Sequence, residues 1–179
     1  MSLQLNVRTL HSGETIIDAL DLTEKAARRC TVRALNETAR WIRNHASQEL
    51  AKATGAPRAL LKKRFYIHKS NLKEAPMRTR ISVNAFDVKA KHLGPLHQLK
   101  TGAKAGRFMF DKAFVATMNA RHGESVYQRK TKDRFPVREM GISIHEQALP
   151  MVEQTLKDAV PYYDKRLRHH MDFEQRRGL

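Results

Sequence analysis

The sequence predicts an α+β protein in which a long N-terminal helix and a C-terminal helix pack on an antiparallel β-sheet. Two segments with a helical repeat of apolar residues, 16–53 and 147–175, flank a central segment with strand-like alternation. The chain has 179 residues, which suits one domain, since domains usually contain roughly 100–200 residues. We therefore expect a single domain over residues 1–179, with a basic, strand-rich core over residues 63–138.

The N-terminal helix is predicted from apolar residues that recur about every 3.6 positions between Ile16 and Leu50. The Thr-Gly-Ala-Pro sequence at residues 54–57 predicts its end, because glycine suits a helix C-cap and proline cannot continue the helix. A helix over residues 16–53 would span roughly 50 Å at 1.5 Å per residue. We expect part of a helix this long to pack against a neighbouring subunit.

The central segment is predicted to form short antiparallel strands, because only brief connections separate the strand-like stretches. These stretches are residues 64–68, 77–85, 113–118, 125–129 and 135–138. Residues 88–107 differ, because glycine and lysine recur there, and they predict a long irregular loop. Such a loop reaches a partner subunit, faces a DNA channel or is simply solvated, and the sequence leaves all three open.

The C-terminal helix is predicted from an apolar stripe that runs from Leu149 to Leu167. Pro150 suits the first turn of such a helix, where no backbone hydrogen bond is lost. Pro161 lies inside the pattern, and we expect it to kink or divide the helix.

The net charge of +16 is the strongest compositional signal. It is localised, because residues 57–136 carry 19 basic and 5 acidic residues, a net charge of +14. A localised basic excess is typical of surfaces that bind phosphate backbones or acidic proteins, although a merely soluble surface remains an alternative. The candidates for residues that face DNA or a partner are Lys89, Lys91, Lys100, Lys104 and Arg107.

The sequence lacks the motifs of nucleotide-binding loops, zinc proteases and serine hydrolases. The carboxylates of the basic segment are widely spaced, unlike those of a two-metal nuclease. We therefore expect no catalytic residue, no metal and no cofactor, and no apolar segment is long enough for a membrane span. The lone Cys30 is predicted to be a small buried apolar residue.

Two other functions stay open at this point. One is a basic DNA-binding accessory protein, which would bind free DNA with a steep salt dependence. The other is a small basic nuclease that uses His122, Tyr127 and Arg129 in general acid–base catalysis.

Residues 113–143 carry a resemblance to a known family. The stretch combines Ala113-Phe114-Val115-Ala116-Thr117-Met118, His122-Gly123, Tyr127-Gln128-Arg129 and Arg134-Phe135-Pro136-Val137-Arg138-Glu139-Met140-Gly141-Ile142-Ser143. This pattern resembles the minor tail protein Z family, the tail-completion or neck proteins of tailed bacteriophages, and the flanking helices agree with it. The sequence departs from the family at residues 119–121, before the His-Gly turn, and at Ile142, where a proline usually precedes the serine.

The resemblance implies structural roles for the residues of this motif. Gly123 is expected to permit a tight hairpin and Pro136 to lie at a sheet edge. Arg129, Arg134 and Glu139 are expected to form a charge network across strands. The full set is Gly123, Arg129, Arg134, Pro136, Glu139, Gly141 and Ser143.

The resemblance also implies a function. It describes a structural virion protein, a ring subunit at the head-proximal end of a phage tail, in the connection through which DNA passes. The expected partners are further copies in a ring, for which we expect a hexamer, neighbouring tail-terminator, tail-tube or head-connector proteins, and phage DNA bound non-specifically in the lumen. Such a protein is expected in the virion, after assembly in the cytoplasm of the host bacterium, with no membrane partner.

Overall fold

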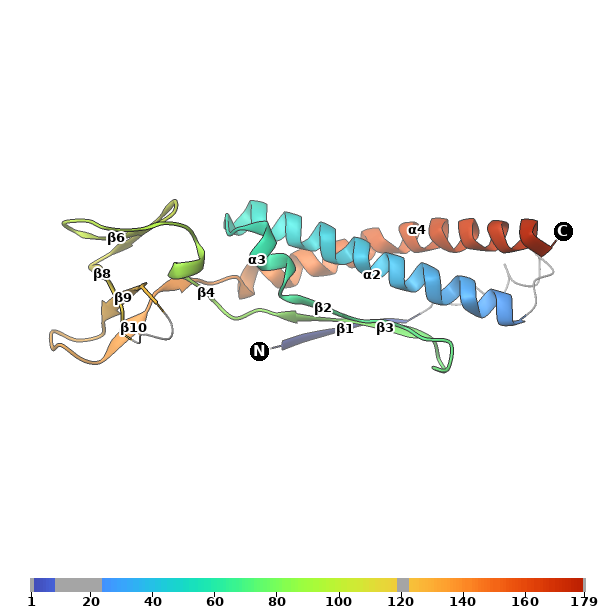
Figure 1. Ribbon diagram of the computed structural model, residues 1–179, viewed down its shortest axis with the longest axis horizontal. Helices are drawn as coiled ribbons and strands as arrows, with labels where there is room; N and C mark the ends of the chain where they lie inside the picture. Colours follow the sequence, from blue (N-terminus) through green and yellow to red (C-terminus); the bar gives the residue numbers. More distant parts are fainter. Residues whose placement is uncertain (1, 9–23, 119–122, 179) are drawn as a thin grey trace.

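The computed structural model describes residues 2–8, 24–118 and 123–178 and shows an elongated α+β molecule (Figure 1). One part, which we call the helical body, contains the long helices α2 (Glu24–Thr54) and α4 (His145–Gly178), the short helix α3 (Arg58–Lys62) and a three-stranded sheet. The other part, which we call the β module, comprises residues 88–142 and lies at the opposite end of the long axis from the C-terminus. The predicted α+β class is confirmed.

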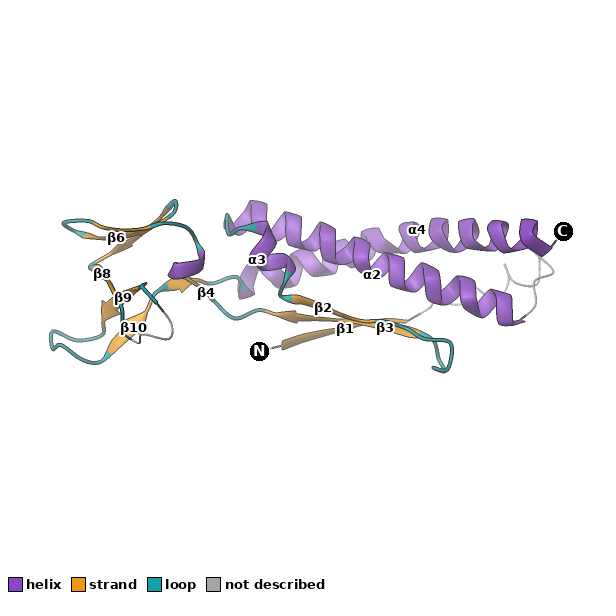
Figure 2. Ribbon diagram, viewed as in Figure 1, coloured by secondary structure: helices purple, strands orange, loops and turns teal. Residues whose placement is uncertain are grey.

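Helices α2 and α4 pack side by side and run antiparallel (Figure 2). The predicted apolar stripe of α2 is buried at Ala34, Ile42, Ala46 and Leu50. Its many alanines allow a close approach of the helices, and Cys30 is fully buried between them with Leu167 and Met171, as predicted.

The α2 helix has 31 residues and would be about 46 Å long at 1.5 Å per residue. Its predicted start at residue 16 falls on residues that lie outside the described part of the chain. Its predicted end is confirmed, because Gly55 follows with φ +70° and donates its N–H to the carbonyl of Ala51 at 2.8 Å.

The α4 helix begins at residue 145 and continues through both prolines. The prediction that Pro150 occupies the first turn is therefore wrong, and of the two outcomes predicted for Pro161, a kink or a division, the helix is not divided. The two prolines leave the carbonyls of Glu146 and Lys157 without their helical donors, but all four residues are exposed. Water can satisfy those carbonyls while the opposite face of the helix stays packed on α2.

The sheet of the helical body has the strand order β1 (Ser2–Arg8), β3 (Arg78–Asn84), β2 (Phe65–His68), with antiparallel pairing throughout. Ile81 and Val83 of β3 are buried, as the alternation predicted, whereas Met77 precedes the strand and is half-buried. Asn36 of α2 ties the sheet to the helix, because its side chain donates to the carbonyl of Ser70 and accepts from its N–H, at 3.1 and 2.9 Å.

The β module contains three further small antiparallel sheets, so the strands form four sheets in place of the one predicted. The first pairs β4 with β11, the second has the order β5-β6-β7 and the third the order β10-β9-β8. The strand bounds are β4 (Val88–Lys89), β5 (Leu96–Gln98), β6 (Gly102–Ala105), β7 (Phe108–Asp111), β8 (Ala113–Ala116), β9 (Ser125–Arg129), β10 (Val137–Glu139) and β11 (Gly141–Ile142).

The prediction of an irregular loop over residues 88–107 is therefore wrong. Strands β4, β5 and β6 and a 3-10 turn over Ala90–His92 occupy this segment. Small residues misled the prediction, since a β-carbon on Gly102 would lie 2.3 Å from the carbonyl oxygen of Phe110. Glycine here allows two strands to approach closely and does not mark a loop.

One continuous apolar core joins the helical body to the β module. Leu50 and Leu61 from the body belong to the same buried cluster as Val88, Phe110 and Val126 from the module. The chain crosses between the two parts twice, after β3 and after β11 (Figure 1). The β module is therefore held to the body by packing as well as by the two connections.

Candidate polyanion-binding tip of the β module

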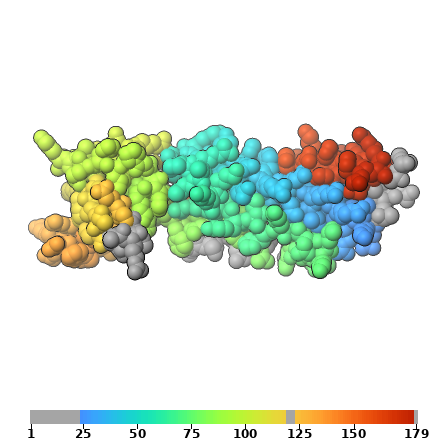
Figure 3. Space-filling view, in the orientation of Figure 1, coloured from blue at the N-terminus to red at the C-terminus, as the bar shows by residue number. Residues whose placement is uncertain are grey.

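Two turns lie at the end of the β module that is farthest from the helical body (Figure 3). They are residues 99–101, between β5 and β6, and residues 130–136, between β9 and β10. The N–H of Lys112 donates to the carbonyl of Thr101 at 2.9 Å, and the N–H of Lys130 donates to the carbonyl of Pro136 at 3.0 Å. The side chain of Gln128 donates to the carbonyl of Asp111 at 3.1 Å and so joins the two sheets behind the turns.

Basic side chains dominate this end of the molecule, which we call the basic tip. Its exposed basic residues are Lys100, Lys112, Arg129, Lys130, Lys132 and Arg134. Asp111 and Asp133 are the acidic residues beside them, and neither forms an ion pair within residues 24–118 and 123–178. Uncompensated charge on exposed, flexible side chains attracts polyanions over a distance of about 8–10 Å at physiological salt.

Two apolar side chains accompany the charges. Phe135 is 59% exposed, and the guanidinium of Arg134 lies 5.7 Å from the centre of its ring. Leu99 is exposed on the neighbouring turn. An exposed aromatic ring beside an arginine is a recognised contact element of protein and nucleic-acid interfaces.

The five predicted basic candidates do not form one group. Lys100 belongs to the basic tip, and Lys104 is exposed on β6, which leads away from it. Lys89 and Lys91 lie at the base of the β module, where Lys91 is half-buried. Arg107 lies on the β6–β7 turn beside the helical body, with its guanidinium 5.2 Å from the centre of the Phe108 ring.

Lys89 forms an ion pair with another residue of the same subunit. Its Nζ lies 2.5 Å from Oε2 of Glu139, while Oε1 of Glu139 accepts from the hydroxyl of Ser125 at 2.8 Å. Burial alone raises the pKa of Glu139, but the hydrogen bonds from Lys89 and Ser125 outweigh this and lower it overall. The pair therefore fastens β10 to β4 and β9 as a charged group.

The predicted network of Arg129, Arg134 and Glu139 is not formed, since no ion pair joins these residues in the described part of the chain. The register explains this result: Val137 stands opposite Arg129, and Glu139 stands opposite Tyr127. Arg129 instead places its guanidinium 5.9 Å from the centre of the Phe114 ring. Both arginines thus extend to the basic tip, where the sequence had suggested only a structural role.

The backbone requires glycine at two positions of the motif. Gly123 has φ +66°, the left-handed conformation that the predicted turn requires. A β-carbon on Gly141 would lie 2.5 Å from the carbonyl oxygen of Val88, so the pairing of β11 with β4 depends on this glycine. Pro136 lies directly before the edge strand β10, and Ser143 is exposed.

Sequence reasoning missed Lys112, Lys130 and Lys132. The run Arg129-Lys130-Thr131-Lys132-Asp133-Arg134 was a usable signal, because it is dense in charge and lies between two strand candidates. Lys112 had no such signal, since its place beside Thr101 follows only from the register of β6 with β7.

The structure gives little support to catalysis. Tyr127, one of the nuclease candidates, is buried, and this burial raises its pKa. His122 lies outside the described residues. Within residues 2–8, 24–118 and 123–178, no three His, Cys, Asp or Glu side chains are grouped as metal ligands, and no helix there is long and apolar enough to cross a membrane.

The fold and the site define the class of this protein: it is an elongated α+β protein with one strongly basic end. The family model for prophage minor tail protein Z (GPZ) matches residues 11–179. The chain belongs to this family, whose members are structural proteins of phage tails. Comparison with curated proteins gave no match, and comparison with solved structures gave none.

Proposed function

We propose that this protein is a tail-completion subunit that forms a ring in the neck of the phage, at the head-proximal end of the tail. Membership of the tail protein Z family supports a place in the tail. The main support for a ring through which DNA passes is the basic tip, where six exposed lysines and arginines lie at one end of an elongated subunit.

The basic tips point into the lumen of the proposed ring, where DNA passes. A channel must attract phosphates without holding one sequence, and lysines on exposed turns provide long-range attraction without reading base edges. Lys100 and Lys112 of the basic tip, together with Lys104 on β6, are the lumen-facing residues in this proposal. The helical body, with its long exposed helix faces, contacts the neighbouring tail-terminator, tail-tube or head-connector proteins.

Cryo-electron microscopy of tails purified with and without this protein tests the proposal. We expect a ring of density at the head-proximal end, a hexamer by our expectation, that is absent when the protein is absent. The elongated subunit should fit this density with its β module towards the axis. Unchanged tails, with the protein in the soluble fraction, would overturn the proposal and favour a free DNA-binding protein with the same basic tip.

A further inference from the structure

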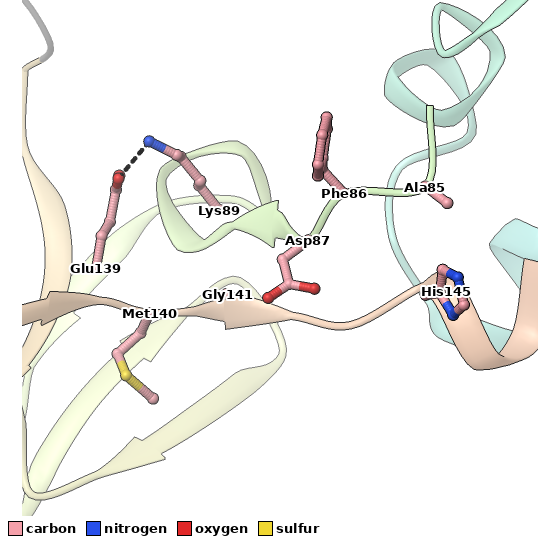
Figure 4. A pocket seen from close by; sticks show the side chains of 8 residues that line it. All are labelled: Ala85, Phe86, Asp87, Lys89, Glu139, Met140, Gly141 and His145. Atoms are coloured by element: carbon pink, nitrogen blue, oxygen red, sulfur yellow. Dashed lines mark ion pairs between the residues drawn. The ribbon is translucent and has the colours of Figure 1, made fainter. Parts of the chain in front are cut away.

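An open pocket lies where the helical body meets the β module (Figure 4). Its volume is about 720 Å³, and its lining residues come from the two chain crossings: Ala85, Phe86, Asp87 and Lys89 from one, and Glu139, Met140, Gly141 and His145 from the other. Phe86 is 62% exposed at its rim, the highest exposure of any large apolar side chain in the described residues. The pocket thus leaves apolar surface uncovered.

One carboxylate in this pocket forms no ion pair or hydrogen bond among the described residues, and the nearby guanidinium of Arg64 interacts with it only through its charge. Glu139 is occupied by Lys89 and Ser125, as described above. The Asp87 carboxylate points towards β11 (Figure 4), and no ion pair or hydrogen bond engages it within residues 24–118 and 123–178. Arg64 nearby donates to the backbone carbonyls of Phe86 and Asp87 and so holds the main chain of this crossing in place.

A turn of the same chain carries side chains that are chemically complementary to this pocket. The turn over residues 130–136 presents the exposed ring of Phe135 beside the guanidinium of Arg134. An apolar ring and a cation match an apolar pocket that carries a free carboxylate. The turn cannot reach the pocket of its own chain, because the two lie at opposite ends of the β module (Figure 1).

We propose that the turn over residues 130–136 of one copy docks into the pocket of the next, with Phe135 against Phe86 and Met140 and with Arg134 paired to Asp87. The contact is head-to-tail, so it joins different surfaces and repeats around a ring when the rotation closes. This inference rests on the proposed ring function and names its subunit contact. In such a ring the turn over residues 130–136 lies in the contact, and Lys100 and Lys112 of the basic tip face the lumen.

DNA is a poorer occupant of the pocket than a second copy. Glu139 is paired with Lys89 at its wall, and the carboxylate of Asp87 has no attraction for a phosphate. The pocket also offers an apolar wall that a phosphate backbone does not use, whereas an exposed phenylalanine does.

Photo-crosslinking in assembled tails tests the contact directly. Phe135 is replaced by p-benzoylphenylalanine, which keeps an aromatic ring and bonds covalently to neighbouring C–H groups on irradiation. We expect covalent dimers and larger products on a denaturing gel, with the crosslinked peptide from residues 85–89 or 139–145. The same replacement at Phe173, which is 48% exposed on α4, is the control and should give no crosslink to those peptides.

A charge exchange gives a second readout. Arg134→Asp and Asp87→Arg should each lower the number of copies per tail by about tenfold, the effect of removing a charge pair from an interface. The variant with both changes should recover most of the copies. Lys69→Asp changes charge equally at an exposed site between β2 and β3, away from the pocket and the docking turn, and should leave the copy number unchanged.

The outcomes separate the contact from the ring function. If the unaltered protein is absent from tails, the proposed function fails. If it is present but residue 135 crosslinks to another surface, to another protein, to DNA or to nothing, the contact is overturned and the neck assignment stands. Failure of the charge exchange to restore the copy number, with both single variants folded, would also overturn the contact.

Discussion

The guanidinium of Arg107 occupies the space above Gly55. A β-carbon on Gly55 would lie 1.1 Å from Nη2 of Arg107, so the turn between β6 and β7 rests on the glycine that ends α2. This contact joins the β module to the helical body at a place far in sequence from both chain crossings. Arg107, which the sequence predicted to face DNA or a partner, is exposed and also contributes to this contact within the subunit.

Gly55→Ala should lower the free energy of unfolding by about 1 kcal/mol, because φ +70° strains any residue with a β-carbon. Displacement of Arg107 should add to this destabilisation. Denaturant unfolding measures it, with fluorescence of Trp41, the single tryptophan, as the signal. Trp41 is a reporter of the helix pair, since it stacks on Tyr162 of α4 at 5.1 Å between ring centres.

Gly123→Ala is the matched control for Gly55→Ala. Gly123 has φ +66°, but a β-carbon there would meet no atom within 4 Å. The difference between the two variants therefore isolates the displacement of Arg107. Equal destabilisation would show that Arg107 moves away without consequence, and unchanged stability in both would contradict the argument from backbone strain.

Glu37 should stabilise the helix pair at neutral pH. Its carboxylate lies 2.5 Å from Nε of Arg166 and 3.2 Å from Nε2 of His170, and both partners belong to α4. Burial raises the pKa of Glu37, but the hydrogen bonds and charges of Arg166 and His170 together lower it below its ordinary value of 4.5. We expect Glu37→Gln to reduce the free energy of unfolding by about 1–2 kcal/mol at pH 7.

The sign of the pH dependence follows from the lowered pKa. The contribution of Glu37 is complete above the pKa of the unfolded chain and is lost as the pH falls through the folded-state pKa. The difference between the protein and Glu37→Gln should therefore shrink below about pH 4.5. Glu153→Gln, at an exposed site of α4, should change stability little at any pH, and a difference for Glu37→Gln that persists at pH 3 would contradict the prediction.

Tyr163 should ionise only at strongly alkaline pH. Burial beside the Cys30 cluster raises its pKa to about 12, with a smaller contribution from the charge of Asp164. Absorbance of tyrosinate during an alkaline titration should show one late step, which Tyr163→Phe removes. Because the unfolded chain ionises near pH 10, the contribution of the neutral phenol to stability is present below pH 10 and is lost as the pH rises towards 12. A single step for all tyrosines would contradict this burial.

Lysines of the basic tip should determine non-specific DNA binding. Changing Lys100, Lys112 and Lys130 to alanine should weaken binding to duplex DNA and reduce the slope of log K against log salt by roughly 0.9 for each phosphate that the protein no longer neutralises. The control variant removes the same charge elsewhere, at the exposed Lys69, Lys157 and Lys165. An equal effect of both triple variants would mean that net charge, and not the tip, governs binding.

The success of the sequence in predicting helices and its failure in the β module have one cause. The apolar stripe from Ala27 to Leu50 repeats over many turns, so its burial could be predicted without any knowledge of the partner helix. Strands of two to four residues, such as β4 or β6, have no such repeat. Their glycines and alanines serve close contacts with strands that only the fold brings near.

The sequence likewise predicted one part of the candidate site and not the other. The net charge of +14 over residues 57–136 predicted a polyanion-binding region, and the run from Arg129 to Arg134 was visible within it. Which lysines share a surface was not predictable. Lys89 is paired with Glu139 across two strands, while Lys112 lies beside Thr101 at the end of the β6–β7 pair.

The sequence by itself determined the α+β class, the helical stripe, the end of α2 at Gly55 and the family, because these depend on local patterns along the chain. Only the tertiary structure decided that α4 continues through Pro150 and Pro161, that residues 88–107 form strands, and that the basic residues gather at one tip. Each of these depends on contacts between residues far apart in sequence. Packing against α2 holds the proline-containing helix together. The pairing of short strands decides which basic residues share one end of the molecule.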